Sequence, residues 1–179
     1  MTKKQIRSKI LLRLKTQKEE DRERKSRAIL KKLFGTLIFK KAKTVMFYIS
    51  FDGEVDTREM IKKARGLGKI IAVPVSAKKG MIYPALLNEN ARLLKGPYGV
   101  REPAVQRTID LHEIDLVVVP GVAFDKHGRR LGRGKGCYDR LLSKFAQRAF
   151  TLGLAFDFQI LPSLPTTAHD VSVKEVLSN

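Results

Sequence analysis

Short apolar runs alternate with helical segments along this chain, and that alternation is the strongest constraint on its fold. Residues 44–50 (TVMFYIS), 69–75 (KIIAVPV), 115–121 (DLVVVPG) and 150–156 (FTLGLAF) are apolar and rich in β-forming side chains. Runs of this length without polar alternation are typical of strands buried on both faces of a sheet. Strands that alternate with helices predict a mostly parallel sheet covered by helices on both faces. We therefore predict an α/β fold with an open, Rossmann-like, three-layer arrangement.

The helices are predicted from apolar residues that recur every three to four positions. Residues 2–17 carry the stripe Ile6, Ile10, Leu11 and Leu14, and residues 19–34 carry Ala28, Ile29, Leu33 and Phe34, followed by Gly35 as a stop. Two more helices are expected, one from the N-cap Thr57 to about Gly66 and one from about Lys135 to Gln147. The remaining segments predict a strand at 80–86 in a hairpin with 69–75, an irregular region at 88–114, and a last strand at 171–176.

Length and composition favour a single soluble domain. The chain has 179 residues, which suits one core, so we expect one domain over residues 1–179. Its single cysteine, Cys137, excludes an intrachain disulfide and a cysteine-rich metal site. No apolar run approaches the roughly 18 residues of a membrane span, and the basic N-terminus lacks the apolar core of a signal peptide. We expect a cytoplasmic protein without a membrane partner.

The net charge of +18 is large but fits more than one kind of partner. It is compatible with a nucleic-acid surface, with small polyanionic ligands drawn into a basic cleft, or with solvated helix faces. RNA-binding modules usually add exposed aromatic residues that stack on bases, whereas this chain has no tryptophan and only 7% aromatic residues. Charge alone leaves these alternatives open.

Residues 128–140, GRRLGRGKGCYDR, have the composition of an anion-binding loop. Gly132, Gly134 and Gly136 let backbone amides approach a ligand closely, and the helix that follows adds its positive N-terminal end. The neighbouring Arg and Lys side chains suit phosphate or carboxylate. The loop lies after the strand 115–121, and ligands of such folds bind beyond the carboxyl ends of strands. It matches neither the Walker A pattern, which needs a hydroxyl residue at 136, nor the Rossmann GxGxxG pattern, which needs a third glycine at 137.

The longer stretch PGVAFDKHGRRLGRGKGCYDRLL (120–142) resembles the signature PG-x-x-FD-x-x-G-x-RLG-x-GxGYYDR-x-L of the 5-formyltetrahydrofolate cyclo-ligase (methenyltetrahydrofolate synthetase) family. Three other segments, KKQIR (3–7), FYISFDGEVDT (47–57) and GPYGVREP (96–103), resemble family segments in the same order. The resemblance covers nearly the whole chain. It implies an α/β fold similar to the NagB/RpiA/CoA-transferase-like group.

The resemblance also implies an enzyme of one-carbon metabolism, a carbon–nitrogen cyclo-ligase. The family converts 5-formyltetrahydrofolate to 5,10-methenyltetrahydrofolate with ATP and Mg²⁺, and releases ADP and phosphate. The formyl oxygen is phosphorylated, N10 closes the ring on the activated carbon, and phosphate leaves. Such chemistry depends on alignment of two ligands and on neutralisation of phosphoryl charge. The implied partners are ATP and 5-formyltetrahydrofolate, including its polyglutamylated forms, with no nucleic acid, and the expected state is a monomer.

By the match to the family, site residues fall into four groups. The residues expected at ATP are Lys3, Arg7, Arg130, Leu131, Gly132, Arg133, Gly134, Lys135, Gly136, Cys137 and Tyr138. Those expected at the folate are Ile49, Glu54, Arg133, Gly134, Lys135, Gly136 and Cys137, with Glu54 on the pterin. The expected catalytic residues are Arg133 and Lys135, and the expected magnesium ligands are Asp139 and Asp170. Taken one at a time, these charged residues are also compatible with solvated helix or loop positions.

Cys137 departs from the family pattern, which has tyrosine at this position. A thiol neither stacks like an aromatic ring nor donates a strong hydrogen bond, so we expect a modest loss of folate affinity with activity retained. Two other functions stay open at this point. One is a basic RNA- or ribosome-associated protein without catalysis, and the other is an enzyme for a different acyl- or phosphate-bearing ligand.

Overall fold

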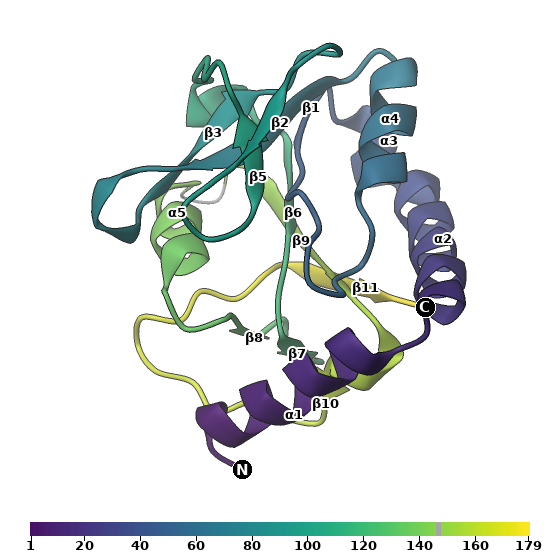
Figure 1. Ribbon diagram of the computed structural model, residues 1–179, viewed down its shortest axis with the longest axis vertical. Helices are drawn as coiled ribbons and strands as arrows, with labels where there is room; N and C mark the ends of the chain where they lie inside the picture. The colour runs from purple at the N-terminus through teal and green to yellow at the C-terminus, as the bar shows by residue number, and fades with distance from the viewer. Residues whose placement is uncertain (146–147) are drawn as a thin grey trace.

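A six-stranded sheet runs through the centre of the molecule in the order β11-β9-β6-β1-β2-β3 (Figure 1). The structure is a computed structural model that describes residues 1–145 and 148–179. The first five strands in that order are parallel, and β3 is antiparallel to β2. The strands of this sheet are β1 (Thr44–Met46), β2 (Ile70–Ser76), β3 (Ile82–Leu86), β6 (Leu116–Val119), β9 (Phe150–Ala155) and β11 (Glu175–Ser178). The predicted open, mostly parallel α/β sheet is confirmed.

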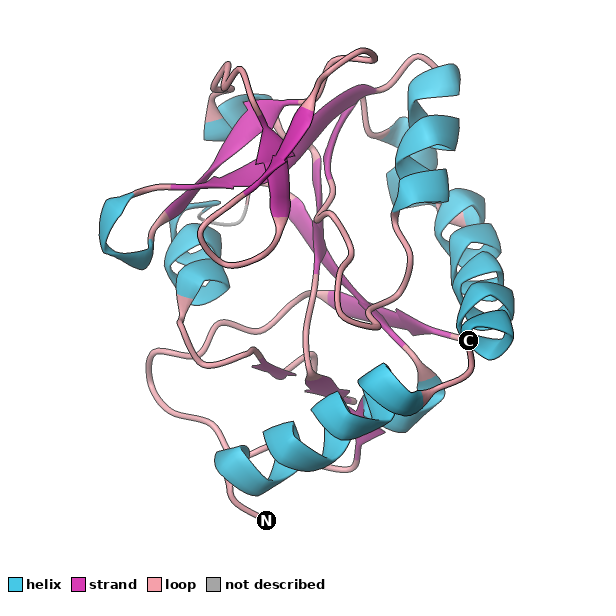
Figure 2. Ribbon diagram, viewed as in Figure 1, coloured by secondary structure: helices cyan, strands magenta, loops and turns pink. Residues whose placement is uncertain are grey.

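Helices cover both faces of the sheet, as Figure 2 shows for α2–α4 on one side and α5 on the other, while α1 crosses its lower end. The α-helices are α1 (Lys3–Thr16), α2 (Glu19–Gly35), α3 (Leu37–Lys41), α4 (Arg58–Gly66) and α5 (Cys137–Phe145). Short 3₁₀ turns are η1 (Lys78–Gly80), η2 (Leu111–Glu113) and η3 (Asp157–Gln159). The three-layer arrangement therefore agrees with the prediction.

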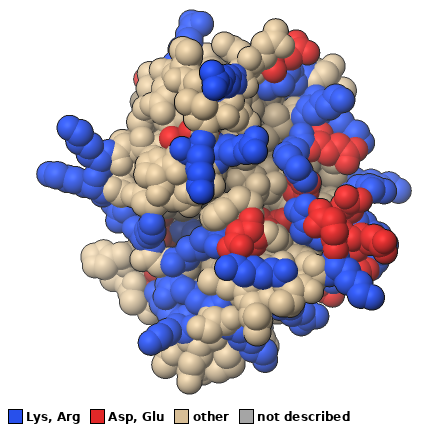
Figure 3. All heavy atoms as spheres, viewed as in Figure 1, with Lys and Arg blue, Asp and Glu red and all other residues tan. Residues whose placement is uncertain are grey.

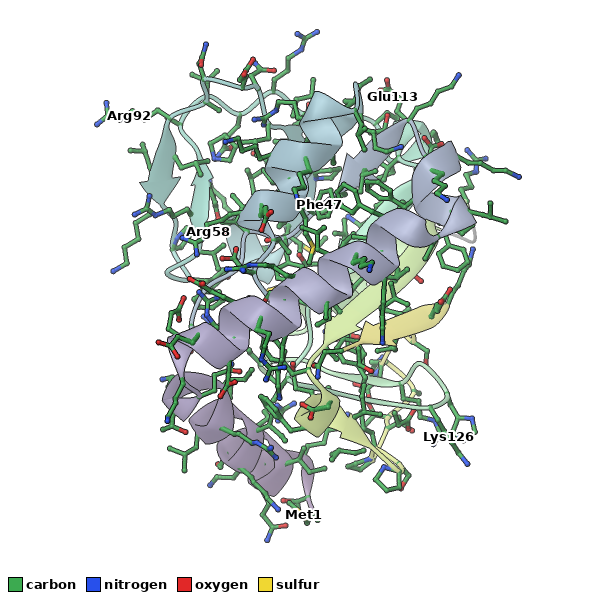
Figure 4. The ribbon with its side chains drawn as sticks, turned by 90° about the vertical axis from the view of Figure 1, so that its right-hand side faces the viewer. Met1, Phe47, Arg58, Arg92, Glu113 and Lys126 are labelled. Atoms are coloured by element: carbon green, nitrogen blue, oxygen red, sulfur yellow. The ribbon has the colours of Figure 1, made fainter. Side chains whose placement is uncertain are left out.

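Alternate residues of each strand supply two separate cores, because neighbouring side chains of a strand point to opposite faces. Val45 and Val118 lie in the core cluster that includes α2, α3 and α4, whereas Met46 and Val117 lie in the cluster that includes α5. Phe47 is fully buried and lies in the interior in Figure 4, in contrast to Lys126, which extends outward at the edge. Burial on both faces explains why the strands read as unbroken apolar runs.

Smaller elements at the end of the sheet shape the site region. The three-stranded sheet β10-β7-β8 and the hairpin β4–β5 surround the carboxyl ends of the central strands. Their strands are β4 (Leu93–Lys95), β5 (Arg101–Pro103), β7 (Ala123–Asp125), β8 (Arg130–Leu131) and β10 (Ile160–Leu161). The β4–β5 hairpin corrects the prediction of an irregular region at 88–114. Each of its strands has three residues, and Leu94 is exposed, so the pattern is too short and too polar to signal strands.

Several boundaries also differ from the predictions. The last strand begins at Glu175 rather than at residue 171, and β1 ends at Met46, although residues 47–49 stay buried in its continuation. The helix expected at 135–147 begins at Cys137, because glycine-loop geometry continues through Gly136, and its predicted end at Gln147 lies outside the described residues.

Two single residues correct the predicted helix signals. Thr57 precedes α4 as expected, but its hydroxyl donates to the carbonyl oxygen of Tyr48 at 2.6 Å and does not cap the helix. In α2 the buried position falls on Ser26, whose hydroxyl accepts from the amide of Asp56, while Ala28 is exposed. In both cases a tertiary contact overrides the local pattern.

Charged side chains are unevenly distributed over the surface. In Figure 3, Lys and Arg are spread across the whole face shown, whereas Asp and Glu gather mainly near α2, where Glu19, Asp21 and Glu23 pair with arginines of the same helix. Among the helices of the described residues, none combines the length and apolar character needed to cross a bilayer.

Candidate active site

A cavity of about 790 Å³ opens at the carboxyl ends of β1, β2 and β6. Figure 3 shows a recess on this face with Lys and Arg side chains at its rim. This is the edge of the sheet at which ligands of open α/β folds bind. One side is formed by residues 130–140, and the other by the ends of the strands and the β4–β5 hairpin.

The glycine loop is held open by its backbone conformation. Gly134 and Gly136 have φ angles of +105° and +65°, in the region that side chains disfavour. Upstream, the buried carboxylate of Asp125 accepts hydrogen bonds from the amides of His127 and Arg129 at 2.9 and 3.1 Å, which shapes the turn before β8. The loop therefore enters the cavity from a rigid turn and continues into α5.

Helix α1 is docked on the glycine loop by its first two turns. The N-cap Thr2 and Gln5 form a reciprocal capping box, which sets the start of the helix. One turn later, the guanidinium Nε of Arg7 donates to the carbonyl oxygen of Gly132 at 2.8 Å. Lys3 does not line the cavity itself but forms an ion pair with Asp170, which does.

Asp139 lies at the start of α5 and is bound on two sides. Its Oδ1 accepts from Nη2 of Arg130 at 2.7 Å and from the amide of Val171 at 3.1 Å. The Nε of Arg130 and the hydroxyl of Tyr138 are buried and have no hydrogen-bond partner among the described residues. Burial raises the pKa of Tyr138, so its hydroxyl stays protonated and able to donate. Two unpaired polar groups beside one cavity point to a ligand that supplies the missing partners.

On the opposite side, Arg133 bridges the glycine loop to the segment after β1. Its Nη1 donates to Asp52 Oδ2 at 2.8 Å and its Nη2 to Glu54 Oε1 at 3.3 Å, and its guanidinium lies 4.3 Å from the ring centre of Phe51. Burial raises the pKa of Glu54 to about 7, although the charge and hydrogen bond of Arg133 partly offset it. Glu54 thus changes charge near neutral pH in the free protein.

The β4–β5 hairpin contributes residues that sequence reasoning did not assign. The ammonium Nζ of Lys135 lies 3.8 Å from the ring centre of Tyr98, and Glu102 accepts from the hydroxyl of Ser76 at 2.5 Å. All four line the cavity. For the segment 96–103 the sequence offers only a resemblance to a family segment, and no local pattern places this segment against β2.

Nearly all the site residues expected from the sequence come together here. The cavity is lined by Arg7, Ile49, Glu54, Arg130, Leu131, Gly132, Arg133, Gly134, Lys135, Gly136, Cys137, Tyr138, Asp139 and Asp170. The exception, Lys3, is attached to the cavity through Asp170. Their roles toward ATP, folate and metal stay predictions, but their convergence from four separate segments is a property of the fold.

The two carboxylates expected to bind magnesium lie in adjoining parts of the cavity, since Asp139 accepts from the amide next to Asp170. Although partial burial favours its neutral form, hydrogen bonds from Lys3 and Thr167 hold the pKa of Asp170 below its ordinary value. Within residues 1–145 and 148–179, no group of three or more His, Cys, Asp or Glu could hold a metal. Two carboxylates with room for phosphate oxygens and water still fit the way Mg²⁺ is usually bound.

Comparison with known proteins identifies the family of the chain. The whole chain, residues 1–179, matches the model of the 5-formyltetrahydrofolate cyclo-ligase family. The chain belongs to the 5-formyltetrahydrofolate cyclo-ligase family. The 5-formyltetrahydrofolate cyclo-ligase of Mus musculus is 32% identical, over 98% of this chain and 92% of its own. The enzyme of Haemophilus influenzae is 35% identical, over 77% of this chain and 76% of its own.

Solved structures of the cyclo-ligase family have the same fold. The 5,10-methenyltetrahydrofolate synthetase of Aquifex aeolicus superposes with a TM-score of 0.86 at 34% identity, covering 98% of this chain and 89% of that one. The synthetase of Mycoplasma pneumoniae, at 22% identity, superposes with a TM-score of 0.81 over 99% of both chains and supports the fold alone. The expected likeness to the NagB/RpiA/CoA-transferase-like group stays a prediction.

Proposed function

We propose that the chain converts 5-formyltetrahydrofolate to 5,10-methenyltetrahydrofolate in an ATP-dependent reaction, as one cyclo-ligase domain over residues 1–179. Family membership over the whole chain supports the reaction. The single observation that carries the assignment of the site is the meeting of the glycine loop with Glu54 across one cavity, through Arg133. The γ-phosphoryl group can move from ATP to the formyl oxygen only if the two ligands lie side by side. A phosphate-binding loop and a pterin-binding carboxylate must therefore face the same cavity.

The glycine loop is suited to the triphosphate of ATP. Amides of Gly132 to Gly136, the ammonium of Lys135 and the guanidinium of Arg7 surround one stretch of the cavity. Because Arg7 is already fixed to the carbonyl of Gly132, little reorganisation is needed when the phosphates arrive. Tyr138 and Arg130 hold unpaired donors that bound ATP would satisfy. Transfer of the γ-phosphoryl group needs such positioning and charge neutralisation above all.

The segment after β1 is suited to the pterin end of the folate. Glu54 accepts hydrogen bonds, as the amino and ring N–H groups of a pterin require, and Ile49 and Phe51 supply apolar surface beside it. Folate that binds Glu54 displaces the Nη2 of Arg133, while Asp52 retains Nη1. Arg133 then lies between the formyl oxygen and the γ-phosphate, where it stabilises the charge that moves between them.

Asp139 and Asp170 are the residues that would hold Mg²⁺. The ion would neutralise phosphate charge and orient the transferred group. Both carboxylates are ion-paired in this structure, with Arg130 and Lys3, so these cations must shift toward the phosphates when the metal binds. That the protein acts as a monomer in the cytoplasm, without a nucleic-acid partner, stays a prediction.

The test is ultraviolet absorbance of the purified protein with 5-formyltetrahydrofolate, ATP and Mg²⁺. Ring closure produces a conjugated amidinium, so product forms a new long-wavelength band. The expected result is growth of this band only when ATP is present, with one ADP released per product. A flat trace from folded protein that still binds ATP would contradict the folate assignment. The cavity would then bind a nucleotide together with a different acyl substrate.

A further inference from the structure

Four carboxylates line the cavity, and one of them differs from the rest. Glu54, Asp139 and Asp170 each form an ion pair, with Arg133, Arg130 and Lys3. Glu102 forms none with any Lys or Arg of the described chain, although the protein is strongly basic. Its carboxylate instead accepts a hydrogen bond from the hydroxyl of Ser76. A buried carboxylate without a cation is costly to maintain unless it serves a ligand.

Glu102 is held firmly at the cavity wall. It is 8% exposed, and Oε1 accepts from Ser76 Oγ at 2.5 Å. A β-carbon on Gly96 would lie 2.6 Å from this same oxygen, so the carboxylate packs against a bare backbone. Ser76 ends β2, whose neighbour β1 continues into the Ile49 segment. Glu102 is therefore fixed at the end of β2, beside the strand whose continuation carries Ile49.

The reaction proposed above creates a need for a proton acceptor. The formyl group is on N5, and N10 still carries a proton when it attacks the formyl carbon. Once the C–N10 bond forms, that proton must leave before the amidinium product can exist. N10 lies beyond the pterin ring, on the side away from the ring atoms that Glu54 would hold. Glu102 and the Lys135–Tyr98 pair lie on the wall of the same cavity at the end of β2 and on the β4–β5 hairpin, whereas Glu54 follows β1.

We propose that Glu102 is the catalytic base that removes the N10 proton during ring closure. This inference rests on the proposed function. The γ-phosphoryl group first moves to the formyl oxygen, with ADP leaving. The N10 lone pair then forms the C–N10 bond, the N10 proton passes to the Glu102 carboxylate, and the C–O bond breaks so that its electron pair departs with phosphate. The protonated Glu102 returns its proton to solvent after the product leaves. Ser76 acts as a positioning residue through its hydrogen bond to Glu102.

The decisive experiment measures two products in a single turnover. Acid-quenched samples give ADP, and absorbance gives the methenyl product. Glu102→Gln keeps the shape and the contact with Ser76 but cannot accept a proton. Its methenyl formation should slow about 100-fold or more, as expected for loss of a general base, while ADP still forms at close to the wild-type rate. Glu102→Ala should regain methenyl formation when formate is added, because the smaller side chain leaves room for a soluble carboxylate. Glu89→Gln, an exposed carboxylate outside the cavity, is the matched control and should match the wild type.

Other outcomes overturn the proposal. Equal slowing of ADP and methenyl formation in Glu102→Gln would show a structural role for the residue, and a methenyl rate within threefold of wild type would show no role.

His169 also lines the cavity and is the rival base. A larger selective loss in His169→Gln than in Glu102→Gln would transfer the role. If Glu102→Gln fails to fold, Gly96→Ala tests the same idea, because its β-carbon must displace Oε1 without removing the carboxylate. Failure of the proposed reaction can be told apart from failure of the Glu102 proposal, because the wild type itself would then show no ATP-dependent methenyl band.

Discussion

The two sides of the cavity are built in opposite ways. The loop face, residues 130–139, comes from one continuous stretch and carries Arg133 and Lys135 on exposed positions. The sheet wall, formed by Ser76, Tyr98 and Glu102, comes from a strand end and a distant hairpin and carries an uncompensated carboxylate. Exposed cations with long side chains suit a phosphoryl group that changes position, whereas a proton acceptor must be fixed relative to one atom. The difference indicates that charge neutralisation and proton transfer are assigned to separate sides.

Besides the bridge from Arg133 to Asp52 and Glu54, two further contacts hold the glycine loop to the other side of the cavity. Lys135 lies over the ring of Tyr98, and the guanidinium Nη2 of Arg140 donates to the carbonyl oxygens of both Lys135 and Gly80 at 2.7 Å. These contacts hold the end of the glycine loop against the β2–β3 turn. A change at one of these residues should therefore affect both sides, and that makes the comparison testable.

The largest effect is expected on the loop face. Lys135→Met removes the ammonium while keeping an apolar stem, and kcat should fall about 10³-fold, as for loss of a group that stabilises transition-state charge. The KM for the folate should change less than kcat, because Glu54 is intact. Steady-state rates of the methenyl band measure both constants, with the exposed Lys144→Met as control. A loss below tenfold would place catalysis elsewhere than on this face.

Glu54→Gln should act on binding instead of turnover. Loss of a charged hydrogen bond to the pterin should raise the KM for the folate about 10- to 100-fold, with a smaller change in kcat. Since the pKa of Glu54 is about 7, wild-type affinity for the folate should weaken as pH falls through 7, and the variant should lose this dependence. Isothermal titration calorimetry of folate binding between pH 5.5 and 8.5 checks this. Identical pH profiles would contradict the placement of the pterin at Glu54.

The pH dependence of folding stability that Glu54 causes should run opposite to the pH dependence of folate binding. The pKa of Glu54 in the folded protein lies above its ordinary value, so its stabilising proton is fully bound at low pH and is lost as pH rises through 7. Between pH 5 and pH 8.5, unfolding free energy should therefore decrease by about 2 kcal/mol more in the wild type than in Glu54→Gln. Urea unfolding at both pH values measures the difference. An unchanged difference would mean that Arg133 compensates the buried charge fully.

Tyr98 tests the contact between the two sides. Tyr98→Leu removes the ring under the Lys135 ammonium and should lower kcat/KM about tenfold, in line with a partly buried cation–π contact. Tyr98→Phe keeps the ring face and should retain most of the activity. If Phe is as poor as Leu, the hydroxyl and not the ring is the important group.

The smallest effect is expected at Cys137, which lines the cavity at the start of α5. Cys137→Tyr restores the residue of the family pattern and should lower the KM for the folate a few-fold, about 1 kcal/mol, through added aromatic contact. The value of kcat should not change. An unaltered KM would place this side chain outside the folate part of the cavity.

The loop face could be predicted because its chemistry is local. Gly134 and Gly136, the cations between them and Asp139 at the helix start lie within a few residues of one another, so the pattern is visible in the sequence. Strands buried on both faces were equally visible as apolar runs. The three-residue strands of the β4–β5 hairpin were not, because an exposed Leu94 and short length give no periodic signal.

The pairings within the site could not be predicted. Arg133 lies 79 residues from Glu54, and Ser76 lies 26 residues from Glu102, so no sequence pattern connects either pair. Thr57 is another residue whose partner the sequence does not reveal, because its hydroxyl donates to the carbonyl oxygen of Tyr48 and does not cap the helix that it precedes. In each case a partner from another segment decides the role of a side chain whose local context favoured a different one.

The sequence by itself determined the order of the main strands and helices, the glycine loop and most of the charged residues that line the cavity. These depend on burial periodicity and on backbone freedom, which are properties of neighbouring residues. Only the tertiary structure decided which carboxylates of the cavity form ion pairs and that Glu102 forms none with the residues that the structure describes. Ion pairing and desolvation depend on distances between segments far apart in the chain, and folding alone sets them.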